Sequence, residues 1–175
     1  MSEVAMKVPL AQRINLRIII FAGIVLFLVG YPAYLYLDSE ISGGIHRSGE
    51  YTAVDLKAMS SFAFDKVVGR LEDVPQRYRD LDGKKVVLEG EMWAPNAAGP
   101  TTGRFDLVYS ISQCCFQGPP QVQHFVKARA MNGDVPNLHY NRVRVTGVLR
   151  VNIDREQGEV TGVYHIDVDK VEPIT

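Results

Sequence analysis

The longest apolar run of the chain lies near its N-terminus. Residues 18–37, IIIFAGIVLFLVGYPAYLYL, carry no charged side chain over twenty positions, which is about the length needed to cross a hydrocarbon core of ~30 Å. This pattern predicts a transmembrane helix. A cleaved signal peptide is the competing interpretation, but its apolar region is typically about 7–15 residues long, and no small-residue cleavage site follows before Asp38. We therefore expect a retained signal anchor.

The residues beside this run predict its orientation. Lys7, Arg13 and Arg17 precede it, whereas the positions directly after it are acidic. Because cytoplasmic flanks carry an excess of Lys and Arg, we expect the N-terminus in the cytoplasm and residues 38–175 in the periplasm of a bacterial cell with an inner membrane. Tyrosine rings favour the interface between membrane and water. Three lie near the exit end: Tyr31, Tyr34 and Tyr36.

From Lys84 onward, apolar and polar residues alternate with period two, as in strands that bury one face. The expected strands are KKVVLEGEMW at 84–93, RFDLVYSIS at 104–112, VQHFVKARA at 122–130, NRVRVTGVLRVN at 141–152 and GVYHIDVDKV at 162–171. Five such strands, with the last two joined as a hairpin, suit a five-stranded, OB-like Greek-key barrel. Gly90 and Gly147 fall inside strands, where a coiled barrel needs bends or close backbone approach. A fragment of a β-sandwich is the alternative.

The segment between the apolar run and the strands is less regular. Residues 38–50 are polar and contain glycine, which suits a tether, and residues 51–72 fit either a strand or a short helix. Pro75 is well placed at the start of a short helix that Gly83 ends. The expected parts are a cytoplasmic N-terminus (1–17), a transmembrane helix (18–37), a tether and lead-in segment (38–79) and an OB-like barrel domain (80–175).

Charge gives no reason to expect a polyanionic partner. The whole chain has a formal net charge of −1, and the part after residue 37 has 16 Lys and Arg against 19 Asp and Glu. Arg142, Arg144 and Arg150 form an outward basic stripe, but a hairpin turn near residues 156–157 would place Arg144 opposite Asp169. Cross-strand charge pairing then explains the stripe, and we expect no nucleic-acid partner.

The sequence shows no catalytic motif. No Ser/His/Asp arrangement, H-x-x-x-H pair, carboxylate dyad or glycine-rich phosphate loop is visible, so we expect no enzymatic activity and no cofactor. His124 alternates onto an apolar face and is interpreted as a buried, hydrogen-bonded histidine. His139 falls in a loop, and His165 points outward beside Asp167. Trp93 ends its strand and either caps a core or contacts a partner.

The two cysteines of the chain are adjacent, in the stretch SISQCCFQGPPQVQHF at 110–125. Neighbours in sequence can form a disulfide only with strain, because disulfide geometry prefers Cα atoms farther apart than one peptide allows. Pro119 and Pro120 stiffen this stretch. Cys114 and Cys115 are thus expected as a strained vicinal disulfide, as two partly buried thiols, or as thiolates on a metal that His124 also binds.

Two of these stretches together resemble a family of bacterial membrane-anchored OB-like domains of unknown function. Its first strand follows the pattern G-x-x-V-x-L-x-G, and a later loop combines cysteine with consecutive prolines. The matching residues are Gly83, Val86, Leu88, Gly90, Cys114, Pro119 and Pro120. In that family histidine commonly follows the cysteine, whereas this chain has Cys115 and Phe116. The resemblance covers residues 80–130 and implies an accessory role beside membrane transport machinery.

These observations predict a non-enzymatic, single-pass membrane protein. Its external domain would bind another protein of a membrane-embedded or envelope complex, with the lipid bilayer contacted by residues 18–37. Possible partner contacts are Trp93, Arg142 and Arg150. The alternative is a metal-binding or thiol-redox protein that uses the loop at Cys114 and Cys115.

The redox state of the cysteine pair can be measured directly. We expect a strained vicinal disulfide or buried thiols rather than a metal site. Intact-mass measurement after alkylation without reductant separates the first two states: two blocked thiols eliminate the disulfide, and a deficit of about two daltons with no intermolecular link establishes it. Metal that co-purifies without chelator would contradict both.

Overall fold

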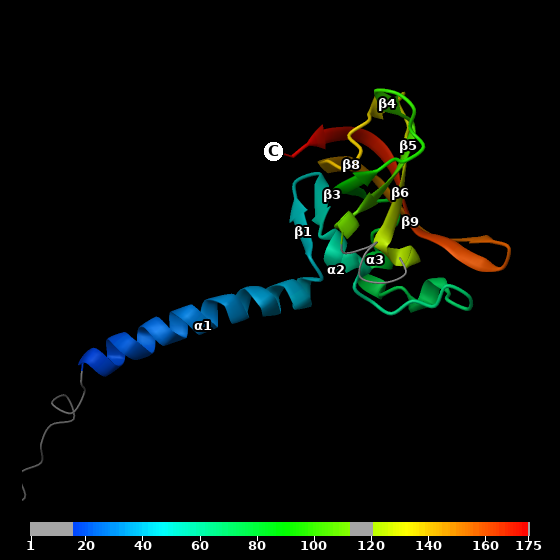
Figure 1. Ribbon diagram of the computed structural model, residues 1–175. Coiled ribbons are helices and arrows are strands. Elements are labelled where there is room, and N and C mark those ends of the chain that lie inside the picture. The colour runs from blue at the N-terminus through cyan, green and yellow to red at the C-terminus, as the bar shows by residue number, and fades with distance from the viewer. Residues whose placement is uncertain (1–15, 113–120, 175) are drawn as a thin grey trace, which may run out of the picture. The chain divides into compact units, whose positions relative to one another are not determined.

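The computed structural model describes residues 16–112 and 121–174 and divides the chain into two units, with the boundary between Ile41 and Ser42. The first unit holds helix α1 (Leu16–Ser42) except for its last residue, and this helix continues through Pro32 (Figure 1). Its window Arg17–Tyr34 has a mean hydropathy of 1.9 and no buried residue. By length and composition this helix is able to cross a membrane, and both a retained anchor and a signal peptide fit it.

The second unit is mainly β. Its helical elements are short: α2 (Leu56–Ser60), η2 (Leu71–Asp73), α3 (Gln76–Arg79) and η3 (Val122–His124). Its strands are β1 (Ile45–Ser48), β2 (Tyr51–Val54), β3 (Lys85–Trp93), β4 (Thr101–Thr102), β5 (Arg104–Val108), β6 (Phe125–Ala130), β7 (Val135–Pro136), β8 (Arg142–Glu156) and β9 (Glu159–Pro173). Each expected run of alternation overlaps one strand of this set, in order β3, β5, β6, β8 and β9, and the last two strands extend beyond their runs.

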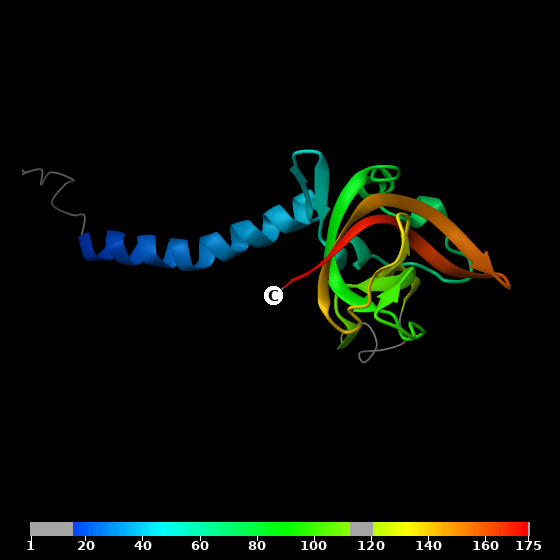
Figure 2. The ribbon, with the colours of Figure 1, turned by 90° about the horizontal axis from the view of Figure 1, so that it is seen from above.

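Five of these strands close into a ring. β3 pairs with β5, β5 with β6, β6 with β9, β9 with β8, and β8 pairs back with β3. Of these five pairings, only that of β6 with β9 is parallel. The long strands bend strongly around the ring in Figure 2. A mainly β domain whose strand ring resembles an OB fold therefore follows the apolar helix, and the simple β-sandwich fragment is wrong.

The alternation predicted which face of each strand is buried. Side chains expected in the core are almost inaccessible: Val86, Leu88, Met92, Phe105, Leu107, Val126, Ala128, Val143, Val145, Leu149, Val151, Tyr164, Ile166 and Val168. The prediction was wrong where it extended the third strand backward. Val122 and His124 lie in the turn η3, and β6 begins only at Phe125. Tyr109 lies beyond the end of β5 and is half-buried.

Two glycines allow the strands of the ring to cross closely. A Cβ atom on Gly90 would overlap the backbone carbonyl oxygen of Val108, and one on Gly147 would overlap that of Asp167. Backbone cannot move aside as a flexible side chain can, so any larger residue would push neighbouring strands apart. The expectation of close backbone approach at both positions is confirmed.

The hairpin of β8 and β9 has a different register from the one expected. The turn is formed by Gln157 and Gly158, which both have positive φ, as in the two-residue turns that suit hairpins. This turn lies one residue later than predicted, and the strands carry irregularities, including one between Thr146 and Gly147. Arg144 is therefore opposite Glu172 rather than Asp169. Bulges shift register in ways that strict alternation does not reveal.

The segment described above as a tether and lead-in contributes to the second unit from Ser42 onward. β1 and β2 form a hairpin, and β2 adds a parallel strand beside β3. The Tyr78 hydroxyl lies 3.0 Å from the carbonyl oxygen of Gly43 and 2.8 Å from that of Ala58. Pro75 immediately precedes α3, and Gly83 follows it with a φ of 74°. Residues 43–83 are thus packed onto the ring.

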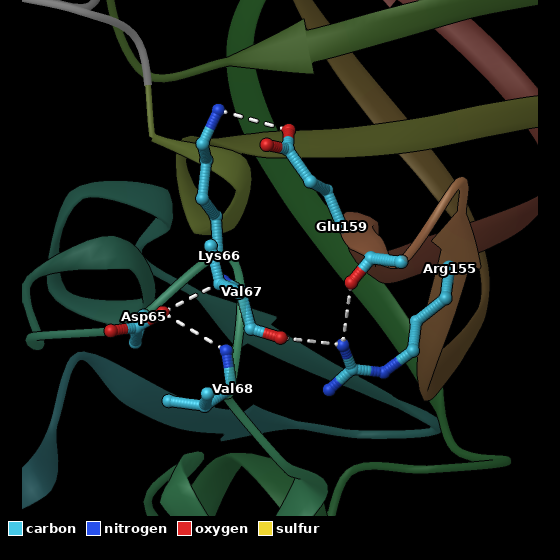
Figure 3. Close-up of polar contacts among 7 residues, drawn as sticks. Asp65, Lys66, Val67, Val68, Arg155 and Glu159 are labelled. Carbon is cyan, nitrogen blue, oxygen red and sulfur yellow. Dashed lines mark hydrogen bonds and ion pairs between the residues drawn. The ribbon is translucent and has the colours of Figure 1, made fainter.

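The far end of the β8–β9 hairpin is held by the lead-in segment (Figure 3). The guanidinium group of Arg155 donates to the carbonyl oxygens of Val67 and Gly69, and Lys66 forms an ion pair of 3.0 Å with Glu159. The carboxylate of Asp65 accepts from the N–H groups of Val68 and Val67, which lowers its pKa. The side chain of Arg155 thus connects the end of the hairpin to the backbone of residues 67–69.

Replacement of Gly147 tests the closure of the ring. We expect Gly147→Ala to destabilise the β domain by about 1–3 kcal/mol, because the new methyl group overlaps backbone at the β8–β9 crossing. Gly99→Ala is the matched control, since a Cβ at Gly99 meets nothing within 4 Å. Thermal or denaturant unfolding of both variants measures the difference. Equal stability of the two would show that the crossing is looser than described.

Candidate functional site

A groove of about 900 Å³ crosses the outside of the ring. Phe105, Ala128 and Ile166 are buried in the core and border the groove from below. The residues that alternate with them on β5, β6 and β9 face outward into it. The loop after β3 closes one side. The lining residues are Trp93, Ala94, Pro95, Asn96, Ala97, Thr102, Arg104, Phe105, Asp106, Lys127, Ala128, Arg129, Asp154, His165, Ile166 and Asp167.

The charged side chains at neighbouring positions on β5, β6 and β9 form rows across the groove. In the first row, positive and negative charges balance each other. Asp106 is opposite Lys127, which lies beside His165 on the parallel strand β9. The Lys127 ammonium is 3.8 Å from a carboxylate oxygen of Asp154. Nε2 of His165 lies 3.2 Å from that carboxylate, although their alignment does not make a hydrogen bond. Opposite signs therefore alternate along this row.

Partial burial changes the acid–base behaviour of this row. Burial lowers the pKa of His165 below its ordinary 6.5, and the Asp154 carboxylate only partly offsets this effect. Burial also raises the pKa of Asp106, against the influence of Lys127. His165 is accordingly neutral at pH 7 and presents a hydrogen-bonding ring rather than a charge.

The adjacent row has a different composition. Arg104 is directly opposite Arg129, and Arg129 is beside Asp167 on β9. The carboxylate of Asp167, however, lies 3.4 Å from Nε of Arg150 on the neighbouring strand β8. This row therefore places two arginines side by side, while its carboxylate is engaged by a third.

Three aromatic rings gather at the end of the groove where β3 ends. The ring centroids of Trp93 and His139 are 5.2 Å apart, those of Trp93 and Tyr140 are 5.5 Å apart, and those of His139 and Tyr140 are 3.9 Å apart. Trp93 also lines the groove, and 63% of the Tyr140 surface is exposed. We call Trp93, His139 and Tyr140 the aromatic cluster.

The backbone holds the aromatic cluster in an uncommon conformation. Tyr140 has a φ of 66°, a value that bulky residues seldom adopt. Its N–H donates to the carbonyl oxygen of Met92, and the N–H of Met92 donates to that of Asn141. Nδ1 of His139 accepts from the N–H of Ala94. Strain of this kind persists where surrounding contacts enforce it, and it concentrates at functional sites.

The structure places two of the three predicted contact residues, Trp93 and Arg150, in or beside the groove. Trp93 lies at the groove, and Arg142 lies two positions after Tyr140 in the chain, opposite Glu91. Arg150 borders the groove through Asp167. The charge-pairing explanation is confirmed for Arg150 and for Arg144, which binds Glu89 at 2.7 Å instead of the expected partner.

The predicted membrane-interface residues lie on α1. Tyr31 and Tyr34 are exposed on this helix, and the ring of Tyr31 stacks on Phe27. The side chain of Tyr36 falls outside the part of the structure that is described.

The proposed metal ligands are only partly visible. Cys114 and Cys115 lie outside the described residues, as do Pro119 and Pro120. The interpretation of His124 as buried and hydrogen-bonded was wrong: it is half-buried, and its Nδ1 has no hydrogen-bond partner among residues 16–112 and 121–174. Burial lowers the pKa of His124. Within those same residues, no group of three His, Cys, Asp or Glu side chains is placed to hold a metal ion.

Sequence reasoning did not single out the outward residues of β5 and β6, or Tyr140, as parts of a site. The alternation showed that Arg104, Asp106, Lys127 and Arg129 point away from the core. It did not show that β6 pairs with β9 in parallel, which is what assembles one continuous groove. The positive φ of Tyr140 has no signal in the residue type.

The titration of His165 tests the compensated row. We expect Asp154→Asn to lower the pKa of His165 further, because the carboxylate that favours the protonated ring is removed. Glu172→Gln, which removes an exposed carboxylate elsewhere, should leave it unchanged. NMR titration of the histidine signals measures both. Because the folded pKa is below the unfolded one, His165 should also reduce stability as the pH falls below 6.5; an unchanged or raised pKa in Asp154→Asn would contradict the geometry.

Comparisons with known proteins give distant likenesses only. No protein-family model matches the chain, and no curated protein matches it. A crystal structure of a DUF3299 family protein from Pseudomonas aeruginosa is 19% identical, with a TM-score of 0.46 over 69% of this chain and 79% of that one.

Two aminoacyl-tRNA synthetases are also similar in part. A putative aspartyl-tRNA synthetase from Leishmania major is 13% identical, with a TM-score of 0.40 over 84% of this chain and 26% of that chain. The asparaginyl-tRNA synthetase from Pyrococcus horikoshii is 18% identical, with a TM-score of 0.31 over 64% and 23%. This chain thus spans about a quarter of each synthetase. The identities and TM-scores of these three structures are low, so the resemblance of the ring to an OB fold rests on its own strand order.

Proposed function

We propose that this chain is a membrane-anchored accessory subunit whose β domain binds another protein of a membrane complex. In this proposal α1 is a retained signal anchor that crosses the inner membrane once, with the N-terminus in the cytoplasm. The OB-like Greek-key barrel then lies in the periplasm. The domain acts by binding, with no chemistry of its own and no nucleic-acid partner.

The aromatic cluster carries this proposal. Tyr and Trp are enriched among the residues that dominate binding energy at protein interfaces, and Tyr140 presents most of its surface to solvent. Its N–H donates to the carbonyl oxygen of Met92, and its ring packs against the rings of Trp93 and His139. A side chain that is already ordered loses little entropy on binding. The cluster therefore has the properties of a preformed protein contact.

The groove beside the cluster supports a protein segment as the ligand. It offers cations, carboxylates and the neutral ring of His165 along the same surface. An extended peptide carries both signs and both donors and acceptors, whereas a nucleic acid presents a uniform row of negative charge. Asp106, Asp154 and Asp167 would repel such a row. A groove lined by charges of both signs therefore favours a protein ligand over a nucleic acid.

The apolar helix supports the membrane part of the proposal. None of the 18 residues of its most apolar window, Arg17–Tyr34, is buried, as expected of a helix whose surface is covered by lipid. Only Gly43 and Gly44 separate the end of α1 from β1. A domain tethered this closely has a high effective concentration at the membrane surface, so that individually weak contacts suffice.

The metal-binding or thiol-redox alternative keeps one supporting observation. The lowered pKa of His124 leaves its ring neutral at pH 7, and neutral imidazole is the form that binds metal. Metal analysis of the full chain purified without chelator tests this alternative. Stoichiometric zinc or copper that is lost in His124→Gln would support the metal-binding form, and metal-free protein would exclude that form.

A tyrosine substitution tests the proposed binding surface. Asn tolerates positive φ, so Tyr140→Asn should keep the fold while it removes the exposed ring. We expect the variant to bind its partner at least about tenfold more weakly, which corresponds to ~1.4 kcal/mol. The measurement is co-purification from native membranes, followed by an affinity measurement with the recovered partner. Met131→Asn, which changes an exposed side chain outside the cluster, is the control.

Two outcomes would contradict the proposal. The first is a wild-type chain that leaves the membrane as a bare monomer with no co-purifying protein. The second is a Tyr140→Asn variant that binds the partner as tightly as the Met131→Asn control.

A further inference from the structure

The row of the groove formed by Arg104 and Arg129 is unfavourable for the free protein. The two residues are directly opposite each other on antiparallel strands, and both are exposed on the same face. Like charges in directly opposite positions destabilise a sheet. Neither arginine makes an ion pair with any carboxylate among the residues whose side chains are described. The fold therefore holds two cations on opposite positions, and neither has an ion-pair partner among the described residues.

The neighbouring row shows that this composition is not a general property of the groove. There Asp106, Lys127 and Asp154 alternate in sign across the strands. In the arginine row, the nearest acidic position on β9 is Asp167, but its carboxylate pairs with Arg150 from the other side. The positive surplus is therefore localised to one end of the groove, at Arg104 and Arg129.

We propose that Arg104 and Arg129 form a subsite that binds a carboxylate side chain from an acidic segment of the protein partner. This inference rests on the proposed function and specifies its ligand. Guanidinium groups match the planar carboxylate with two parallel hydrogen bonds. A carboxylate between the two arginines supplies the missing negative charge and converts a repulsive pair into a compensated one.

The surrounding carboxylates favour the singly charged carboxylates of an acidic peptide over the more highly charged groups of a phosphate chain. Asp106 and Asp167 each lie in or beside the arginine row, and they would repel the further charges of a phosphate chain. Trp93 is opposite Asp106, two positions along β5 from Arg104, which is about 7 Å in a strand. A partner segment in extended conformation can thus place one side chain on the aromatic cluster and an acidic side chain at the arginine pair.

The experiment uses the full-length protein in detergent with a hexaglutamate peptide as the probe. Calorimetry at low salt measures affinity, and NMR follows the side-chain Nε–H signals of the arginines. We expect hexaglutamate to bind and to shift the signals of Arg104 and Arg129. Arg104→Gln and Arg129→Gln should each weaken binding about tenfold, the effect of losing one charge-assisted contact. Arg47→Gln removes an exposed arginine on β1, outside the groove, and should leave the affinity unchanged.

A stability measurement separates a ligand subsite from a structural arginine pair. If the two arginines repel each other, Arg129→Gln should raise the melting temperature of the free protein. Hexaglutamate should raise the melting temperature of the wild type but not that of this variant. A fall in the melting temperature of this variant would show that the arginines stabilise the fold, and the proposal would be wrong.

Two further results would overturn the proposal. Equal loss of affinity in Arg47→Gln and Arg129→Gln would mean that the peptide binds by overall charge. Tighter binding of inorganic pyrophosphate than of hexaglutamate, lost in the same two groove variants, would assign the subsite to phosphate instead of carboxylate. These results concern only the isolated protein and the probe. The proposed function is tested separately, by the binding of the native partner to Tyr140→Asn.

Discussion

Closure of the strand ring between β3 and β8 is the constraint on which the rest of the domain depends. β3 and β8 stay paired over seven consecutive positions, from Lys85 to Glu91, while β8 must also cross β9 at Gly147. β8 can pair with β3 and β9 at the same place because Gly147 has no Cβ atom, which would overlap the carbonyl oxygen of Asp167. Once the ring is closed, β5, β6 and β9 share one outward surface, and the groove exists because these three strands are neighbours.

Polar contacts then join the elements outside the ring to it. The hydroxyl of Tyr164, which is buried within the ring, donates to the carbonyl oxygen of Met59 in α2, and burial strongly raises the pKa of this phenol. Arg155 and Lys66 tie the hairpin end to residues 65–69. The long β8–β9 hairpin is thereby a supported extension, which keeps Asp154 at a defined place beside the groove.

The two rows of the groove differ in how far their charges are balanced by opposite charges. Where opposite charges meet, as at Lys127 and Asp154, the surface is electrostatically satisfied and offers little to a ligand. Where charges of one sign meet, at Arg104 and Arg129, a ligand can restore the balance. The aromatic cluster adds a rigid apolar contact at the other end. Together these features describe a surface suited to recognition of an extended segment rather than to a chemical step.

The sequence by itself determined the local structure and the burial of this protein. The apolar run predicted α1, and alternation identified the inward faces, because the side-chain period of a strand is set by the backbone. The tertiary structure alone decided the register and the neighbours. A late turn at Gln157 and the irregularity beside Gly147 moved Arg144 to Glu172, and the parallel pairing of β6 with β9 assembled the groove. Such long-range pairings depend on how the whole ring closes, which no local pattern encodes.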